Sequence, residues 1–296
     1  PLLVKCYPAD TLAKLAGLKA AIDSETDAGP YRPLLWIALV TILRRCSPVG
    51  TAPWQYVLPS KRKSRPSDPF RAFDDQVETM ATDMREMSAH ATGASATLYE
   101  EDARSCPSVP ADWADLVVTS PPYPNNYDYA DATRLEMTFF GEIGGWTDLQ
   151  AVVRKRLIHS CSQHEVDFDA EQALSSPLLR PISGELRTVY ESLCRERLVH
   201  GGRKTYNKMV VAYFLDLARV WTALRRVTRP GGRVCFVVGD SAPYGIHVPV
   251  ERWLGELSVS VGFRSYEFEK LRDRNTKWLN RKHRVPLQEG RLWVEA

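Results

Sequence analysis

The chain has 296 residues, of which 44% are hydrophobic and 25% are charged, and its formal net charge is +3. This composition is typical of a globular protein with a full hydrophobic core, and it argues against a disordered or disulfide-stabilised chain. The small positive excess permits nucleic-acid binding without arguing for it, because the location of the charge matters more than its sum.

The six cysteines are scattered and form no CxxC pair, which indicates reduced thiols. The longest apolar run, residues 34–43, is too short to span a bilayer, and no signal peptide is visible. These features predict a cytoplasmic protein. His159, Cys161 and His164 have no second pair of ligands at a recognisable spacing, so we expect no metal site.

The first third of the chain is predicted to be largely helical. Apolar residues recur at helical spacing within 2–22, 34–45 and 73–90. The segment 47–69 contains several prolines and a basic run, which predicts an exposed loop. A short strand is then expected at 96–99, and it would end at the acidic residues 100–102.

The rest of the chain alternates between predicted strands and helices. The expected strands are 113–119, 234–238, 265–270 and 291–294, the last two as an antiparallel hairpin. The expected helices lie within 130–200 and at 209–227 and 251–261. This order predicts an α/β fold with a mostly parallel sheet and helices on both faces.

One motif stands at the point where ligands bind in such a sheet, the carboxyl end of a strand. The strand at 113–119 stops at Ser120-Pro121-Pro122-Tyr123, because two consecutive prolines cannot continue a central strand. Residues 115–123, Asp-Leu-Val-Val-Thr-Ser-Pro-Pro-Tyr, resemble the fourth motif of the DNA amino-methyltransferases. The resemblance extends over 96–135 and 205–296, and it implies a Rossmann-like class I methyltransferase sheet with helical insertions.

The resemblance implies a catalytic role for Ser120, Pro121, Pro122 and Tyr123. The Ser120 hydroxyl and the Pro121 carbonyl would accept the hydrogens of an exocyclic amino group, and two prolines would hold these acceptors rigidly. Tyr123 would stack on a base swung out of the double helix. The implied cofactor is S-adenosylmethionine, which would pass its methyl group in line to the nitrogen.

Two flanking segments match the same family. Residues 98–104 resemble the strand whose terminal acid accepts a hydrogen bond from the adenine amino group of the cofactor, which makes Asp102 the candidate. Residues 224–234 resemble the helix, turn and fifth strand common to many S-adenosylmethionine-dependent methyltransferases. The cofactor-binding residues implied in this way are Asp102, Ala103, Thr119 and Ser120.

The family's glycine-rich cofactor loop has no counterpart in the sequence. Asp68-Pro69-Phe70 matches its first three positions, but no glycine follows. Pro1–Val4 resembles the stretch just after the acidic residue of the second motif. We therefore expect a methyltransferase core at 1–23, 93–138 and 205–296 without its first strand and glycine loop. The missing segment would lie on a second polypeptide, or would have been cleaved or removed.

The sequence also bears on the target base and on the DNA contacts. Serine at the first motif position favours cytosine N4 over adenine N6, and RNA stays open as a substrate. A cytosine-C5 mechanism needs a cysteine nucleophile, usually after a proline, and Cys106-Pro107 has the reverse order. Helical inserts are expected at 24–92, with the basic loop, and at 139–204, the candidate target-recognition region.

Residues near the motif and in basic runs are the candidate DNA contacts, because amides read base edges, rings stack on bases and cations pair with phosphates. They are Asn125, Asn126, Tyr127, Lys61, Arg62, Lys63, Arg65, Arg203 and Lys204, to which the run Arg154-Lys155-Arg156 can be added. The sequence thus predicts a DNA amino-methyltransferase of restriction-modification or phage-defence type. A non-catalytic DNA-binding subunit that needs a second chain is the alternative.

Overall fold

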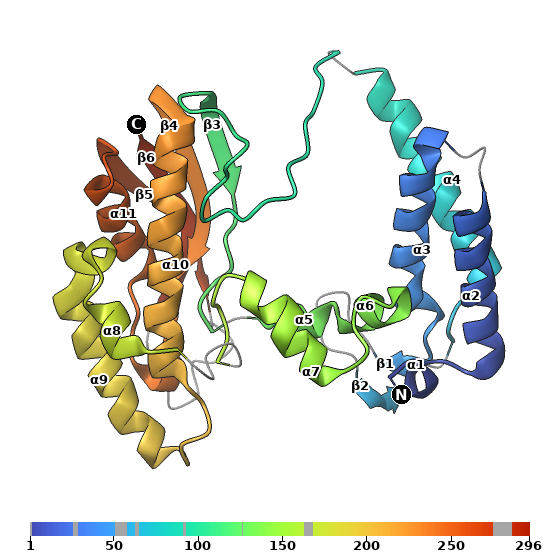
Figure 1. Ribbon diagram of the computed structural model, residues 1–296, viewed down its shortest axis with the longest axis horizontal. Coiled ribbons are helices and arrows are strands. Elements are labelled where there is room, and N and C mark those ends of the chain that lie inside the picture. The colour runs from blue at the N-terminus through green and yellow to red at the C-terminus, as the bar shows by residue number, and fades with distance from the viewer. Residues whose placement is uncertain are drawn as a thin grey trace. The chain divides into compact units, whose positions relative to one another are not determined.

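A computed structural model describes residues 2–25, 29–50, 65–90, 93–125, 127–162, 168–274 and 286–296, and the backbone of 58–62. The chain divides into two compact units (Figure 1). Unit 1 comprises Pro1–Thr97 and Tyr129–Val152, and unit 2 comprises Leu98–Asp128 and Val153–Ala296. The methyltransferase core expected at 1–23, 93–138 and 205–296 and the inserts expected at 24–92 and 139–204 stay predictions.

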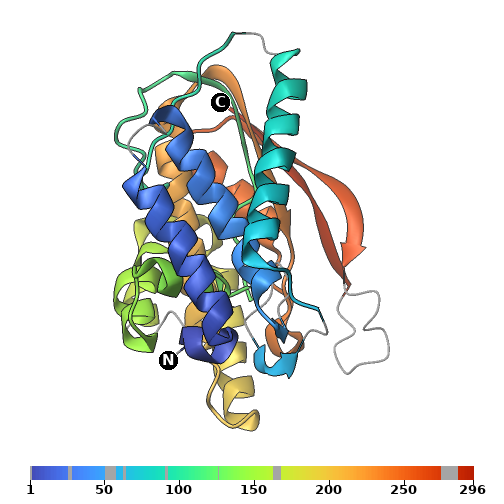
Figure 2. The ribbon, with the colours of Figure 1, turned by 90° about the vertical axis from the view of Figure 1, so that its right-hand side faces the viewer.

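Unit 1 is built mainly from helices. They are α1 (Leu2–Cys6), α2 (Ala9–Ser24), α3 (Arg32–Cys46), α4 (Pro69–Ser88), α5 (Tyr129–Ala132), α6 (Arg134–Phe140) and α7 (Trp146–Asp148), with a 3₁₀ turn at Gly29–Tyr31, a π turn at Leu149–Val153 and two short antiparallel strands, β1 (Val49–Gly50) and β2 (Leu58–Arg62). The helices α2, α3 and α4 pack side by side (Figure 2). Their core includes Leu15, Leu39 and Ile42, which are fully buried.

The start of α4 explains why Asp68-Pro69-Phe70 is not a cofactor loop. The Asp68 carboxylate caps the helix by accepting hydrogen bonds from the backbone N–H groups of Phe70 and Arg71. Pro69 occupies the first helical turn, where its missing N–H costs no intrahelical hydrogen bond. The tripeptide is therefore a helix start.

Unit 2 contains the main sheet. Its strands are β3 (Ala114–Thr119), β4 (Thr228–Gly239), β5 (Ser265–Arg274) and β6 (Leu287–Glu295); its helices are α8 (Ala170–Leu174), α9 (Ser183–Val199), α10 (Tyr206–Val227) and α11 (Val250–Ser260), with 3₁₀ turns at Arg154–Arg156, Pro177–Ile182 and Pro243–Gly245. The strand order is β3-β4-β6-β5. The helix α10 leads directly into β4 and lies along it (Figure 1).

The sheet is mixed, and this corrects the prediction of a mostly parallel sheet. The pair β3–β4 is parallel, whereas β4–β6 and β5–β6 are antiparallel, so the four described strands do not form a mostly parallel sheet. The predicted terminal hairpin is confirmed. The strand expected at 96–99 is wrong, because residues 93–100 are irregular and Leu98 is 94% exposed. An apolar residue that finds no sheet face to cover gives a strand no stability.

Aromatic packing joins α10 to the sheet. The Trp221 ring stacks on Phe236 of β4 with centroids 4.3 Å apart and an interplanar angle of 18°, and both side chains are fully buried. Most of α10 is buried, and the helix predicted at 209–227 is confirmed. Among the described residues, no helix combines the length and the apolarity that a bilayer span requires.

Candidate functional site

The Ser-Pro-Pro-Tyr motif stands at the carboxyl end of β3, as predicted. In the parallel ladder Thr119 lies opposite Phe236, and Ser120 is the first residue beyond it. The Ser120 hydroxyl donates a hydrogen bond to the Val237 carbonyl at 3.2 Å. Thr119 and Ser120 are exposed, whereas Pro121 is buried. The motif is therefore fixed to the neighbouring strand while its hydroxyl oxygen stays accessible.

Tyr123 is held next to the end of β4. The Arg274 guanidinium lies 5.1 Å from the centroid of its ring, a cation–π distance. Arg274 also donates to the Asp240 carbonyl at 2.8 Å, and its guanidinium passes so close to Gly239 that an added Cβ would lie 2.7 Å from Nη1. Burial raises the pKa of Tyr123, and a hydrogen bond with Ser120 opposes this rise. The phenol is therefore neutral near pH 7.

The loop after Tyr123 is anchored to residues 154–160. Asn125 has a left-handed backbone, with φ of 61°, and its N–H donates to the Ser160 carbonyl at 2.7 Å. The Ser160 hydroxyl donates to the Tyr127 carbonyl at 3.4 Å. Asn125 is exposed and Tyr127 is half-buried, and Asn126 lies outside the described residues. The loop predicted to contact DNA is therefore fixed by its backbone, and the Asn125 side chain faces solvent.

A buried ion pair ends this loop and corrects one predicted DNA contact. Arg154 donates to the Asp128 carboxylate at 2.5 Å, and the two side chains are only 1% and 2% exposed. A buried guanidinium cannot reach a phosphate, so Arg154 acts as a structural partner of Asp128. Lys155 and Arg156 belong to the same run but are exposed.

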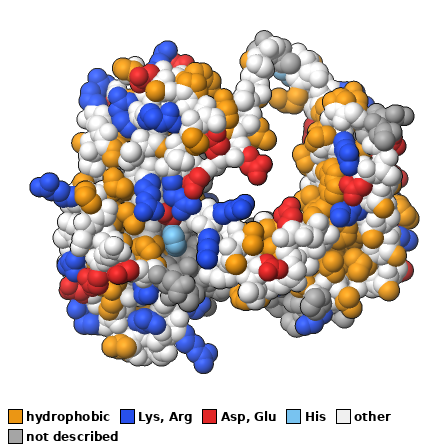
Figure 3. All heavy atoms as spheres, viewed as in Figure 1, with side chains coloured by type: hydrophobic (Ala, Val, Ile, Leu, Met, Phe, Trp, Pro, Cys, Tyr) orange, Lys and Arg blue, Asp and Glu red, His pale blue; other side chains and the backbone are white. Residues whose placement is uncertain are grey.

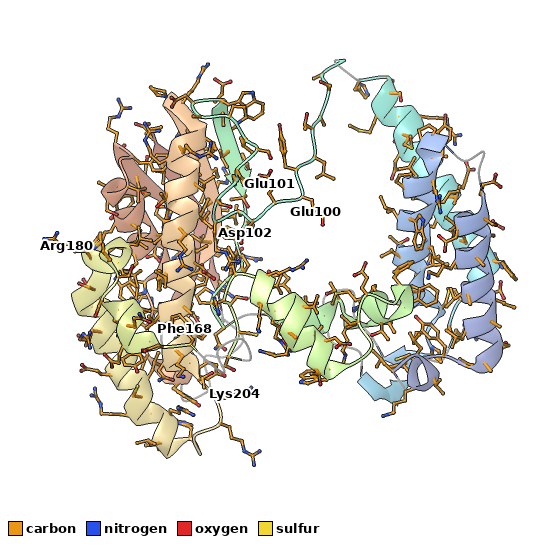
Figure 4. All side chains as sticks on the ribbon, in the orientation of Figure 1. Glu100, Glu101, Asp102, Phe168, Arg180 and Lys204 are labelled. Carbon is orange, nitrogen blue, oxygen red and sulfur yellow. The ribbon has the colours of Figure 1, made fainter. Side chains whose placement is uncertain are left out.

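Asp102, the predicted acceptor for the cofactor, begins a tight turn. Its carbonyl accepts from the N–H groups of Ser105 and Cys106 at 3.0 and 2.9 Å. Its carboxylate, 47% exposed, accepts a bidentate hydrogen bond from Arg104, which holds the pKa of Asp102 below its usual range. Ala103 is exposed in the same turn. In Figure 4, Glu100, Glu101 and Asp102 lie on the irregular segment that precedes β3.

Asp216 of α10 is a buried carboxylate at the centre of a charged cluster. Its oxygens accept from Arg104 Nη1 at 3.2 Å, from the His159 N–H at 3.2 Å and from His159 Nδ1 at 2.7 Å. Arg219 contributes a longer contact of 3.4 Å. Burial raises the pKa of Asp216, but hydrogen bonds from His159 and the charges of His159 and Arg104 outweigh it. The carboxylate is therefore held ionised.

A second acidic cluster follows the end of β4. The Asp240 carboxylate, 2% exposed, contacts His247 Nε2 at 3.1 Å and accepts from the Val250 N–H at 3.3 Å. Glu251, at the start of α11, accepts from Gln288 at 3.0 Å and shares a hydrogen bond with Asp240. Burial, followed by the Asp240 hydrogen bond and charge, raises the pKa of Glu251 to about 7.

The predicted basic contacts are distributed over both units. Arg203 and Lys204 are exposed in the loop between α9 and α10, where Gly201 and Gly202 both have positive φ angles. Lys204 lies near the start of α10, well separated from Asp102 (Figure 4). Arg65 is exposed in unit 1, Lys63 lies outside the described residues, and only the backbone of Lys61 and Arg62 is described. On the face of unit 2 in Figure 3, basic side chains gather in several groups, and some acidic side chains lie between them.

The described residues supply some of the groups that a nucleotide-binding site needs. Asp102 supplies a fixed, half-exposed acceptor and Ser120 an accessible hydroxyl oxygen, which suit an exocyclic amino group. Gly232, Gly239 and Gly290 leave no space for a Cβ atom, because protein atoms fill each position. Within the described ranges, no three His, Cys, Asp or Glu side chains converge as metal ligands.

Sequence reasoning missed the residues that hold the site together. Arg104, Ser160 and Asp216 have no motif of their own. One signal was present, because Asp216 is the single acid in the apolar stretch 209–218, Met-Val-Val-Ala-Tyr-Phe-Leu-Asp-Leu-Ala. A lone acid on a core helix needs a buried partner, so it marks a polar network.

The chain is similar to two named DNA methyltransferases. It is 29% identical over 169 residues to the type II methyltransferase M.AvaI of Nostoc sp. strain PCC 7120, a match that covers 53% of this chain and 32% of that protein. It is 27% identical over 180 residues to M.BsoBI of Geobacillus stearothermophilus, covering 54% of this chain and 33% of that protein. The chain thus matches about a third of the length of these relatives.

The remaining comparisons add little. No protein-family model matches the chain. A crystal structure of TTHA0409, a candidate DNA modification methylase of Thermus thermophilus, covers 66% of this chain and 51% of its own at 18% identity, with a TM-score of 0.29. A score of that size does not define a shared topology. Similarity to type II DNA methyltransferases over about half of the chain is therefore the finding that the comparisons support.

Proposed function

We propose that this chain carries the base-binding part of a DNA amino-methyltransferase that uses S-adenosylmethionine as its methyl donor. The observation that carries the proposal is the Ser-Pro-Pro-Tyr motif at the carboxyl end of β3, directly beside β4. The similarity to M.AvaI and M.BsoBI supports the same class of reaction. The proposed biological setting is restriction-modification or phage defence.

The geometry of the motif suits a weakly nucleophilic amino group. Because the Ser120 hydrogen is donated to the Val237 carbonyl, the Ser120 oxygen acts as an acceptor, and beside its hydrogen bond with Tyr123 it keeps one lone pair for a hydrogen of the substrate. Pro121 and Pro122 have fixed φ angles, which restrict the backbone that carries the Pro121 carbonyl. Two fixed acceptors on one amino group would hold its hydrogens out of the ring plane and free its lone pair for methyl transfer.

Tyr123 supplies the stacking surface in this proposal. One face of its ring is occupied by Arg274, which is itself tied to Asp240. The target base would stack on the opposite face, between Tyr123 and the loop that contains Asn125, Asn126 and Tyr127. Phosphates would be contacted by Lys61, Arg62, Lys63, Arg65, Arg203 and Lys204.

Cytosine N4 is the proposed target, and adenine N6 is the alternative. The preference rests on serine at the first motif position, because the adenine-specific relatives of this motif usually carry Asp or Asn there. The structure adds that Ser120 is tied to Val237 as a neutral donor and acceptor.

The donor would be held at its adenine end by Asp102 and Ala103 and near its methyl group by Thr119 and Ser120. A second polypeptide, or an N-terminal segment missing from this chain, would supply the glycine cradle for its methionyl end. Within the described residues β3 pairs with β4 alone, so its other edge offers free backbone groups to a further strand. We propose that the cradle enters the site on such a strand.

The proposed function is tested by the methylated base that appears in DNA. The chain is expressed in a host without methylation of amino groups in DNA, and genomic DNA is digested and analysed by mass spectrometry. We expect N4-methylcytosine when the wild-type chain is present together with the segment that carries the glycine cradle, and a loss of at least about 100-fold with Ser120→Ala. N6-methyladenine would select the alternative target.

The matched control is Ser175→Ala, because Ser175 is also exposed and also donates to a backbone carbonyl, that of Glu171. This variant should methylate normally. Absence of any methylated base, together with DNA binding that survives Ser120→Ala and needs no donor, would contradict the enzyme and identify a DNA-binding subunit.

A further inference from the structure

We infer that Asp216 is a positioning residue that couples the turn carrying Asp102 to the loop that follows Tyr123. The inference rests on the proposed function, because these two segments are its donor-binding and base-binding elements. All contacts on which it depends lie within unit 2. Asp216 touches neither proposed ligand and would act through Arg104 on one side and His159 on the other.

A carboxylate at position 216 of α10 is unusual, because the residues around it in the helix are buried and apolar. Asp216 is 1% exposed, and its neighbours along α10, Phe214, Leu215, Leu217 and Ala218, are all buried apolar residues. Burying a charge is costly, and an apolar side chain of similar size at such a site is often neutral or stabilising. The contacts of Asp216 are therefore better explained by the geometry that they impose than by stability alone.

On the donor side, Arg104 connects Asp216 to Asp102. The guanidinium donates to Asp102 with Nε and Nη2 at 2.9 and 2.7 Å, and to Asp216 with Nη1 at 3.2 Å. The side chain of Arg104 is only 16% exposed. A planar guanidinium fixed by two carboxylates has one orientation, so the direction of the Asp102 carboxylate depends on the position of Asp216.

On the base side, His159 connects Asp216 to the motif loop. Two contacts to one carboxylate, from the backbone N–H and from Nδ1, fix the backbone of His159. The next residue, Ser160, holds the loop through the Asn125 N–H and the Tyr127 carbonyl. Arg104 also contacts this side directly, because it donates a hydrogen bond to the Arg156 carbonyl at 3.3 Å.

The coupling would keep the methyl donor and the target base aligned with each other. A methyl transfer in line requires that the donor's methyl carbon and the amino nitrogen meet within a narrow range of distance and angle. If the two segments were anchored separately, each could shift without the other. Anchoring both on one carboxylate of a buried helix gives them a common reference.

The inference is tested by hydrogen exchange on the isolated chain, read at two amides. The Asn125 N–H, bonded to Ser160, reports the base side, and the Cys106 N–H, bonded to the Asp102 carbonyl, reports the donor side. Arg104→Gln should raise the exchange rate of Asn125 by about tenfold, and His159→Leu should raise that of Cys106 by a similar factor. The effect of His159→Leu is a cross-effect, because His159 does not hold the donor side directly, whereas Arg104 also contacts the base side through the Arg156 carbonyl.

The control variant is Glu185→Gln, which breaks an exposed ion pair with Arg252 elsewhere in unit 2 and should leave both amides unchanged. The inference is wrong if each substitution raises exchange only in its own segment, or if Glu185→Gln raises both as strongly. Exchange needs neither donor nor DNA. A chain that fails to methylate DNA would therefore contradict the proposed function, while the exchange result would still decide the coupling.

Where the donor and DNA bind, a second measurement follows. Asp216→Asn keeps the shape of the side chain but removes its charge. It should raise both the Kd for S-adenosylmethionine and the KM for DNA, each by about tenfold. A loss of thermal stability with both constants unchanged would show a purely structural role and overturn the inference.

Discussion

The two buried acidic clusters of unit 2 offset the cost of burying a carboxyl group in opposite ways. Asp216 is surrounded by Arg104, His159 and Arg219, and its pKa lies below the usual range because these contacts outweigh the desolvation. Glu251 lies against another acid, Asp240, and burial and that neighbour raise its pKa to about 7. One cluster keeps its charge and the other keeps a proton, so pH and substitution should affect them with opposite signs.

The largest expected effect is the loss of a cation from the charged cluster. Arg104→Gln should lower the free energy of unfolding by about 3 kcal/mol, because it leaves the Asp216 charge buried with less compensation. Urea denaturation measures this value. Adding Asp216→Asn should recover part of the loss, since no uncompensated charge then remains. Equal losses in the single and the double variant would mean that Arg104 stabilises by packing alone.

A smaller and opposite pH response is expected of the protonated cluster. Because the folded-state pKa of Glu251 is raised from 4.5 to about 7, folding favours its neutral form. The associated stability is fully present below pH 4.5 and is lost as the pH rises to about 7, by roughly 1–2 kcal/mol after solvent screening. Glu251→Gln should flatten the unfolding free energy over this interval.

His247 adds a second contribution to the same pH dependence of stability. A hydrogen bond to Asp240 raises its pKa above 6.5, so its contribution is present below pH 6.5 and is also lost as the pH rises through the higher value. In the Glu251→Gln variant a residual slope should therefore remain above pH 6.5. A stability that increases between pH 5 and 7 would contradict the assignment of the proton to Glu251.

At acid pH the charged cluster should respond in turn. The folded-state pKa of Asp216 lies below its ordinary 3.8, so its stabilising contribution is present above pH 3.8 and is lost as the pH falls through the lower value. Its direction is opposite to that of Glu251, because hydrogen bonds and the charges of His159 and Arg104 lower the pKa of Asp216. Acid titration followed by tryptophan fluorescence measures it, and Asp216→Asn should lack this step.

The smallest effect is expected from an exposed pair. Arg252 and Glu185 are bonded through both oxygens of Glu185, but their side chains are 42% and 58% exposed. Glu185→Gln should change the unfolding free energy by only about 0.2–1 kcal/mol. A larger loss would show that exposure is not what separates this pair from the buried clusters.

The sequence predicted local features well. The strand before Ser120 and the terminal hairpin follow from apolar patterns and turn residues that are read within a few positions. The proline pair marks the end of β3 for the same reason. The helix α10 has an apolar face long enough to be recognised on its own.

Long-range relations could not be predicted in this way. The strand expected before Asp102 failed because 96–99 has no described neighbour to pair with. Arg154 reads as one basic residue among three, and only its contact with Asp128 reveals that it is buried. The partners of Asp216 come from positions 104 and 159, far from it in sequence, and a single sequence contains no record of that proximity.

The parallel ladder between β3 and β4 has a consequence for the order of folding. Thr119 pairs with Phe236, more than one hundred residues later in the chain, whereas β5 and β6 are consecutive strands. Contacts between distant residues require a larger loss of chain entropy and form more slowly. We therefore expect the hairpin, β4 and their covering helices to assemble first. The strand that carries the Ser-Pro-Pro-Tyr motif would dock late, so the candidate site would be completed in the final step of folding.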